Sequence, residues 1–136
     1  MQATLGSGSA RAEVDVVMDF YRGLLARLPH NGGFNFWVGK FRAAQCQGAA
    51  AVIAEVESIS SRFAQSGEYL GRARTNAQYI GDLYNAFLRR GGDLGGVLFW
   101  IGQLGTRTRE AIRVEFKNSP EFNARVNAII AQGCLQ

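Results

Sequence analysis

The sequence predicts an all-α fold, a compact bundle of about six to seven helices formed by two related helical repeats. Apolar residues recur at spacings of three and four along almost all of the 136 residues, which is the period of an amphipathic helix. No segment alternates apolar and polar residues as a half-buried strand does. The second half of the chain repeats a pattern of the first, and 47% hydrophobic residues suffice for one core.

The first half of the chain predicts three helices. The first covers about 11–28, and Pro29 with the Asn31-Gly32-Gly33 turn is expected to end it. A short second helix is expected over 34–44 and a third over about 49–65. Each has its apolar residues on one face; in the first helix they are Val14, Val17, Tyr21, Leu24 and Leu28.

The second half predicts four more helices. One over about 76–90 is expected to end at Gly91-Gly92, and two short helices follow over about 95–104 and 108–117. The last begins at Ser119-Pro120-Glu121, because serine caps free N–H groups, proline fits the first turn and glutamate meets the positive end of the helix. It runs to about 132, where Gly133 is placed to end it.

Two segments that lie 63 residues apart carry the same pattern. The window 17–41 holds eight identities at this shift, where chance gives roughly one or two. The identical pairs are Asp19/Asp82, Tyr21/Tyr84, Arg27/Arg90, Gly32/Gly95, Gly33/Gly96, Phe36/Phe99, Trp37/Trp100 and Gly39/Gly102. A later block, Ser66-x-Glu68, repeats at a shift of 53, so the first copy holds ten more residues, around Cys46 to Ser61. We expect one domain over 13–134, with copies over about 13–72 and 73–134, after a flexible tail at 1–12.

These repeated residues resemble the core motif of the bacterial domain-of-unknown-function family 4214. The motif pairs an aromatic–Arg helix end with a Gly–Trp helix start, and a Ser-x-Glu-aromatic block follows. The matching residues are Tyr21, Arg27, Gly33, Trp37 and Gly39, then Tyr84, Arg90, Gly96, Trp100 and Gly102, with Ser66, Glu68, Tyr69 and Ser119, Glu121, Phe122 in the blocks. The resemblance covers roughly residues 14–130.

The resemblance implies an all-α fold, since the family is similar to the helical linker domain of phycobilisomes. It also implies a non-catalytic module, because family members commonly occur as repeats within exported or surface bacterial proteins. The Pro-Asp of the usual turn is Pro29-His30 in the first copy and Gly92-Asp93 in the second, so each copy keeps half of it.

Charge and hydropathy exclude several classes of function. The net charge of +4 is spread from Arg11 to Arg125 without a basic block, so we expect no nucleic-acid partner. No apolar run approaches the ~20 residues of a membrane span, so no membrane insertion is expected. The start of the chain lacks the pattern of a signal peptide, which leaves a cytoplasmic chain as the alternative to a domain of an exported protein.

Five residues near the Gly-rich turns are candidates for binding. Trp37 and Trp100 can stack on a sugar, but their apolar neighbours favour packing in the core. His30, Asn31 and Asp93 lie in the turns, where capping or solvation competes with ligand binding. No metal site or cofactor is expected, because no second histidine and no series of calcium ligands accompanies them.

Two further sets of residues have a structural interpretation. Arg27 and Arg90 are expected in the last turns of their helices, where a cation meets free carbonyl groups. Cys46 and Cys134 lie at the ends of predicted elements and form a disulfide if the fold brings them close and the compartment is oxidising.

The sequence therefore predicts a protein that is not an enzyme. We expect a non-catalytic interaction or structural module of an exported or cell-surface bacterial protein, offering a helical surface to a protein or glycan partner. The alternatives are a glycan-binding module that uses aromatic residues near the Gly-rich turns, and an intracellular linker or scaffold. A hydrolase that uses Asp93, Glu68 or His30 would need two carboxylates facing each other across a cleft, and the repeat gives no sign of one.

Overall fold

The elements of the chain are all helical in the computed structural model, which describes residues 11–135. The first copy holds α1 (Ala12–Phe20), the π-helical turn η2 (Tyr21–Leu25), α2 (Asn31–Gln45), α3 (Ala49–Ala64) and α4 (Gly67–Leu70). The second holds α5 (Asn76–Leu83), the π-helical turn η3 (Tyr84–Leu88), α6 (Leu94–Gln103), α7 (Arg109–Lys117) and α8 (Pro120–Gln132). The described part contains no strand, so the predicted all-α fold is confirmed. Most of the predicted tail at 1–12 lies outside the described residues.

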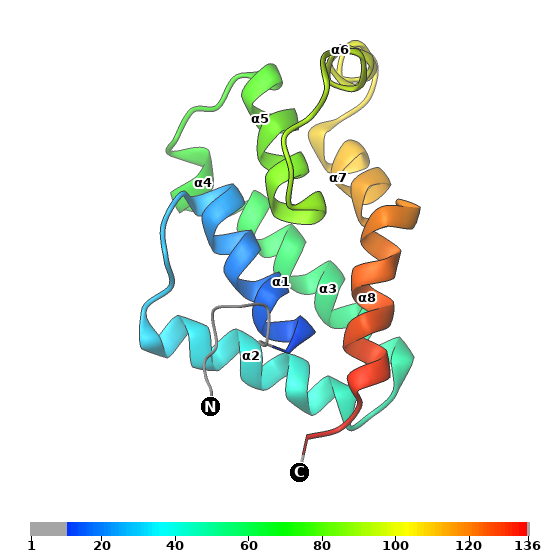
Figure 1. Cartoon of the computed structure of the whole chain (residues 1–136). Coiled ribbons are helices and arrows are strands. Elements are labelled where there is room, and N and C mark those ends of the chain that lie inside the picture. Colours follow the sequence, from blue (N-terminus) through cyan, green and yellow to red (C-terminus); the bar gives the residue numbers. More distant parts are fainter. Residues whose placement is uncertain (1–10, 136) are drawn as a thin grey trace.

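Helix α1 lies in the middle of the molecule and the others surround it (Figure 1). It contacts α2, α8 and η3, while α3 packs against α2, α7 and α8. Aromatic rings from both copies fill the space between these helices and form one continuous core. Its largest fully buried side chains include Phe20, Phe41, Tyr69, Tyr79, Phe87 and Phe122.

The two copies meet directly where η2 crosses η3. A Cβ atom placed on Gly23 would lie 2.7 Å from the Cβ of Ala86, a distance that real side chains do not reach. Ala86 is the residue at the position in the second copy equivalent to Gly23. Glycine at 23 therefore allows two equivalent turns to approach each other at the centre of the molecule.

The first helix of each copy ends earlier than its sequence predicts. Ala26 (φ 56°) and Arg89 (φ 59°) adopt the left-handed conformation and close the two π-helical turns. In the first copy the Ala26 N–H donates to the Tyr21 carbonyl, so the chain turns before Pro29 is reached. The expected breaks at Pro29 and Gly91-Gly92 therefore lie just beyond the real helix ends.

The predicted Asn31-Gly32-Gly33 turn is wrong, because these three residues form the first turn of α2. His30, with an extended backbone, precedes the helix, and its carbonyl accepts the Phe34 N–H at 2.9 Å. The glycine at 33 serves a close approach: a Cβ there would lie 2.5 Å from the Tyr21 hydroxyl.

Serine caps begin α4 and α8, and the one at Ser119 is the cap that the sequence predicts. Ser119 accepts the Phe122 N–H and Pro120 occupies the first turn of α8, as predicted. Ser66 caps the single-turn helix α4 in the same way, through the Tyr69 N–H. Gly133, in the left-handed region with φ 70°, ends α8.

The start and the end of the described chain are fastened to the end of α2. Cys46 and Cys134 form a disulfide, with their Cα atoms 4.4 Å apart. Glu13, fully buried, accepts from Arg11 (2.7 Å) and Arg42 (3.0 Å). Although burial opposes its charge, these two guanidinium groups and a backbone hydrogen bond hold the pKa of Glu13 below its usual value.

Candidate interaction surface

The motif residues of the first copy build a clamp between two helix ends. Arg27 donates two hydrogen bonds to the Glu68 carboxylate, at 2.7 and 3.0 Å, and its guanidinium lies 5.1 Å from the centre of the Tyr21 ring. This bidentate contact holds the pKa of Glu68 below its usual value. The first clamp therefore fixes the end of η2 to the Ser-x-Glu block that begins at Ser66.

The second copy builds the same clamp from the equivalent residues. Arg90 donates to both oxygens of Glu121 at 3.0 Å and lies 5.2 Å from the centre of the Tyr84 ring. Arg27 and Arg90 follow the left-handed end residues, so the expected position in the last helical turn is wrong by one or two residues. Their main partner is a glutamate rather than the free helical carbonyl groups that the sequence predicts, although each also donates to the carbonyl of the next residue, Leu28 or Gly91.

The two tryptophans pack beside the clamps. The Trp37 ring lies 5.6 Å from the Phe63 ring and is only 8% exposed. Trp100 lies 5.3 Å from Phe116 and is partly exposed. This is the core packing that the sequence favours over a stacking platform, and it is more complete in the first copy.

The other three candidate residues lie at the starts of α2 and α6, at opposite ends of the molecule (Figure 1). His30 is exposed and caps α2 without a side-chain hydrogen bond, and Asn31 is the exposed first residue of that helix. Asp93, at the position equivalent to His30, accepts the Gly96 N–H at 3.4 Å as the cap of α6. The structure therefore does not bring these candidates together into one site.

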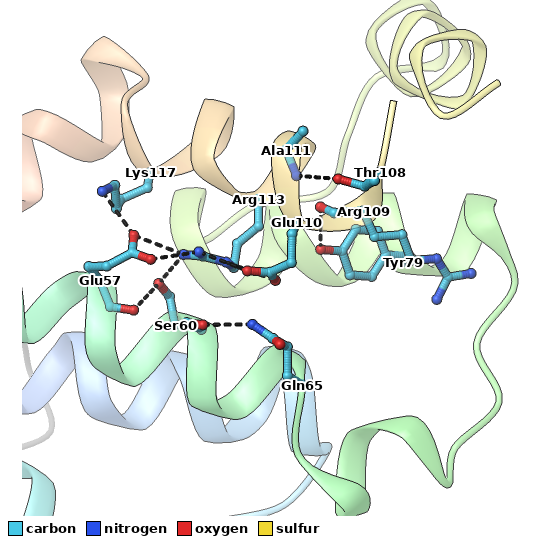
Figure 2. Close-up of polar contacts among 11 residues, drawn as sticks. Glu57, Ser60, Gln65, Tyr79, Thr108, Arg109, Glu110, Ala111, Arg113 and Lys117 are labelled. Atoms are coloured by element: carbon cyan, nitrogen blue, oxygen red, sulfur yellow. Dashed lines mark hydrogen bonds and ion pairs between the residues drawn. The ribbon is translucent and has the colours of Figure 1, made fainter. Parts of the chain in front are cut away.

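A network around Arg113 has no counterpart in the sequence analysis (Figure 2). Arg113, 2% exposed, donates to Glu57 (2.8 Å), Glu110 (3.0 Å) and Ser60 (2.8 Å), and so joins α3 to α7. Although burial opposes its charge, these glutamates raise the pKa of Arg113. Lys117 also contacts Glu57 at 2.9 Å.

The two glutamates of this network occupy equivalent positions in the two copies. The shift of 53 that aligns the Ser-x-Glu blocks also aligns Glu57 with Glu110 and Ser60 with Arg113. The sequence thus held a signal for this pair of glutamates, although not for the arginine between them. Both carboxylates bind the same guanidinium, so the arrangement suits a structural link between helices.

Two hollows on the surface of residues 11–135 are lined in part by charged side chains. One of about 390 Å³ between α2 and α3 is lined mainly by small side chains with Lys40 and Glu55. Another of about 360 Å³ holds Asp19, Arg22 and Arg89, and the guanidinium of Arg125 also reaches Asp19, at 2.6 Å. Arg22, Arg89 and Arg125 thus share the carboxylate of Asp19, and Asp15 also lies 3.8 Å from Arg89.

The surface that stands out is the outer face of α6. Leu94 is 75% exposed, and Leu98 and Phe99 are each 57% exposed. No charged residue occurs from Leu94 to Gln103, so the helix presents an uncharged apolar stripe to solvent. We call Leu94, Leu98 and Phe99, with the exposed Gly95 and Gly102, the α6 stripe.

The inner side of α6 is less covered than that of α2, because the second copy lacks part of the helix that packs against α2. Helix α2 packs between α1 and α3, whereas α6 makes its main contacts with α5 and stands at the edge of the molecule (Figure 1). Helix α3 has 16 residues, while its counterpart α7 has nine. Val38 and Phe41 are therefore buried, but their equivalents Ile101 and Leu104 remain partly exposed.

Comparison with protein-family models gives a match in the second half of the chain. A protein-family model, described as "Domain of unknown function (DUF4214)", matches residues 60–126. No curated protein matches the chain, and no solved structure does. Across residues 11–135, no helix combines the length and apolarity needed to cross a bilayer, and no group of three or more His, Cys, Asp or Glu side chains is placed to hold a metal ion.

Proposed function

Residues 60–126 place the chain in the family described as Domain of unknown function (DUF4214), and we propose that it is a non-catalytic interaction module whose α6 stripe binds a partner protein. One observation carries this proposal: three large apolar side chains lie exposed together on a helix without charge. Burying apolar surface is favourable by about 25 cal/mol per Å², so leaving these side chains in water has a cost in free energy. Contiguous exposed apolar patches are typical of interaction sites.

The first copy supports the proposal, because it shows that the fold does not need this surface. The positions equivalent to Leu94 and Leu98 are Asn31 and Asn35, which are also exposed. The same helix in the same domain is thus polar in one copy and apolar in the other. The leucines serve something outside the monomer.

We place the module in an exported or cell-surface bacterial protein. The Cys46–Cys134 disulfide supports this location, because structural disulfides persist mainly in oxidising compartments. Intact mass of protein from its native cell, with and without reductant and alkylation, tests the location. A bonded pair supports export, and two free thiols favour the intracellular scaffold.

Site-specific photo-crosslinking tests the proposed function. A photoreactive amino acid replaces Leu98 in the full chain expressed in its native cell, and a matched variant carries it in place of Asn35. We expect a crosslinked product of defined mass from position 98 and none from position 35. Equal labelling at both positions, or none at either, would overturn the proposal.

A glycan partner is a second candidate, favoured by the exposure of two equivalent aromatic rings. Phe36 is 52% exposed and Phe99 57%, and each lies at 5.0 Å, edge to face, beside its neighbouring tryptophan. Glycan binding on these rings predicts that Phe36→Ala and Phe99→Ala weaken binding alike in a titration followed by calorimetry. Protein binding at the α6 stripe predicts that only the Phe99 variant matters.

A further inference from the structure

Three arginines from three different segments gather around the carboxylate of Asp19. Arg125 of α8 donates to it at 2.6 Å, Arg89 at the end of η3 lies 2.9 Å from it, and Arg22 of η2 lies 3.6 Å from it. Asp15, 3.8 Å from Arg89, is a second carboxylate at the edge of the group. Burial lowers the pKa of Arg125, and the charge of Arg89 lowers it further although Asp19 opposes both. Among residues 11–135, three guanidinium groups therefore share two carboxylates, which leaves an excess of positive charge.

This excess of charge opens onto the hollow of about 360 Å³ beside Asp19, which Arg22, Gly23, Asn85 and Arg89 also line. The side chain of Arg22 is 57% exposed and that of Arg89 is 50% exposed. Their guanidinium groups form ion pairs but no hydrogen bond within the described part of the chain, and the exposed Asn85 amide forms none there either. Each guanidinium has five N–H donors and each amide two, so the hollow offers many unused donors to a ligand.

The second copy shows that the fold does not need these arginines. Asp82, at the position equivalent to Asp19, has one arginine: Arg74 donates to both of its oxygens, at 3.0 and 2.9 Å, and the Tyr69 hydroxyl donates at 2.7 Å. The positions equivalent to Arg22 and Arg89 carry no charge and hold Asn85 and Ala26. The same turn therefore forms with these two arginines and without them. A ligand that the monomer does not supply would account for their presence.

We propose that the hollow beside Asp19 binds an oxyanion, a phosphate or sulfate group, between Arg22 and Arg89. The planar fork of a guanidinium binds two oxygens of such a group at once. Because the two arginines come from different segments, a tetrahedral group with several oxygens suits them better than a planar carboxylate does. The Asn85 amide is a further donor, and Asp19 holds the guanidinium groups in place. This site shares no residue with the α6 stripe, so the two proposals are tested separately.

NMR titration of the full chain tests the site, with inorganic phosphate and inorganic sulfate added separately at pH 6 and at an ionic strength held constant with chloride. We expect the Nε–Hε signals of Arg22 and Arg89 and the side-chain amide signals of Asn85 to shift and to saturate in the millimolar range, because exposed charge contacts are weak. We expect no such shifts at Arg27 and Arg90, which glutamates already hold. The ion that binds more tightly identifies the group as phosphate or sulfate. Shifts that do not saturate with either ion, or that are as large at Arg27 and Arg90, would overturn the site.

A first pair of variants separates a local site from the net charge of the protein. Arg22→Asn gives η2 the residue that η3 carries at the equivalent position, and we expect binding of the tighter ion to weaken at least about fivefold. The contact of Arg22 with Asp19 is long, at 3.6 Å, so we expect an unchanged thermal midpoint. Arg62→Asn removes the same charge from an exposed position on α3 and is the matched control. Equal weakening by the two variants would show that the ion responds only to net charge.

A gain of binding is a second test, because partial unfolding cannot imitate it. Asn85→Arg places a further guanidinium at an exposed position of the same hollow, so we expect the ion to bind at least about threefold more tightly. Asn35→Arg adds the same charge at an exposed position on α2, and we expect it to leave binding unchanged. Binding that Asn85→Arg does not strengthen, or that Asn35→Arg strengthens as much, would contradict an oxyanion site in this hollow.

Discussion

Helices α2 and α6 occupy equivalent places in the two copies and meet different surroundings. Both begin after an exposed cap residue, carry a Phe-Trp pair and place a glycine against the hydroxyl of a tyrosine. Helix α2 is then covered by the long helix α3, while α6 remains at the edge of the fold. The inner side of α6 is less buried, and its outer side has leucine where α2 has asparagine.

This difference separates what the fold requires from what the surface adds. The tyrosine, arginine, glutamate and glycine of the motif have the same contacts in both copies, so their role is to hold the helices together. The leucines at 94 and 98 have no such role, because the asparagines of α2 satisfy the same backbone. A repeat thus contains its own control, and the predictions below that change one copy use the other as reference.

The largest effect is expected from the disulfide between Cys46 and Cys134. Cys46 follows α2 in the first copy, and the second copy has no cysteine at the equivalent position after α6. Replacing both cysteines, as C46S/C134S, releases a closed segment with a sequence separation of 88 residues. The loss of that constraint on the unfolded chain predicts a decrease of about 4 kcal/mol in the free energy of unfolding. Urea denaturation measures it, and the wild type with reductant serves as a second comparison. A loss of stability under about 1 kcal/mol would show that the salt bridges of Glu13 hold these ends by themselves.

A smaller effect is expected where glycine meets tyrosine. Alanine at position 33 or 96 would place its Cβ 2.5 Å from the hydroxyl of Tyr21 or Tyr84, so part of the structure must move. In the first copy α2 is held between α1 and α3, and we expect Gly33→Ala to cost about 2 kcal/mol. Helix α6 has room to shift, and we expect Gly96→Ala to cost about 1 kcal/mol or less. Chemical denaturation of the two variants measures the difference, and a larger cost at position 96 would contradict the view that α6 is loosely held.

Most of the helices of the two copies could be predicted from the sequence. The periodicity placed α3, α6, α7 and α8 within about a residue of their observed bounds, since each has clear end signals such as Ser119 and Gly133. The helix ends at Ala26 and Arg89 could not be found, because neither residue type favours the left-handed conformation. Tertiary contacts of the π-helical turns impose it there.

The candidate site was less accessible to sequence reasoning. Helix α6 is apolar on almost all sides, so its pattern does not show which face is buried. The side of α6 that faces solvent is set by the packing of this helix against α5, which is a property of the assembled fold. The Arg113 network was missed for a similar reason, since its partner Glu57 is 56 residues away in the chain.

A difference in pH dependence is expected between the two clamps. Hydrogen bonds from Arg27 and Arg90 lower the pKa values of Glu68 and Glu121, so each clamp adds stability above the usual pKa of glutamate and loses it as the pH falls through the lowered value. The nearby His30 lowers the pKa of Glu68 further, while the second copy has Asp93 at that position. We expect Glu68→Gln to reduce the acid-induced loss of stability more than Glu121→Gln does. Urea denaturation from pH 7 to pH 3 tests this order, and equal slopes would exclude a contribution from His30.

The smallest effect on stability, with the largest effect on partner binding, is expected from moving the α6 stripe to α2. Asn31→Leu with Asn35→Leu changes two exposed positions, so we expect the free energy of unfolding to change by less than about 0.5 kcal/mol. Gly32, Gly39 and Phe36 already occupy the remaining positions of the stripe, so the variant carries two apolar helix faces at opposite ends of the molecule. The variant therefore offers a partner protein two apolar faces, whereas the wild type offers one. We expect a photoreactive amino acid in place of Phe36 to give, in this variant, the crosslinked product that position 98 gives in the wild type, and to give none in a chain that keeps Asn31 and Asn35. A variant without that product would show that leucine on this helix is not what binds the partner.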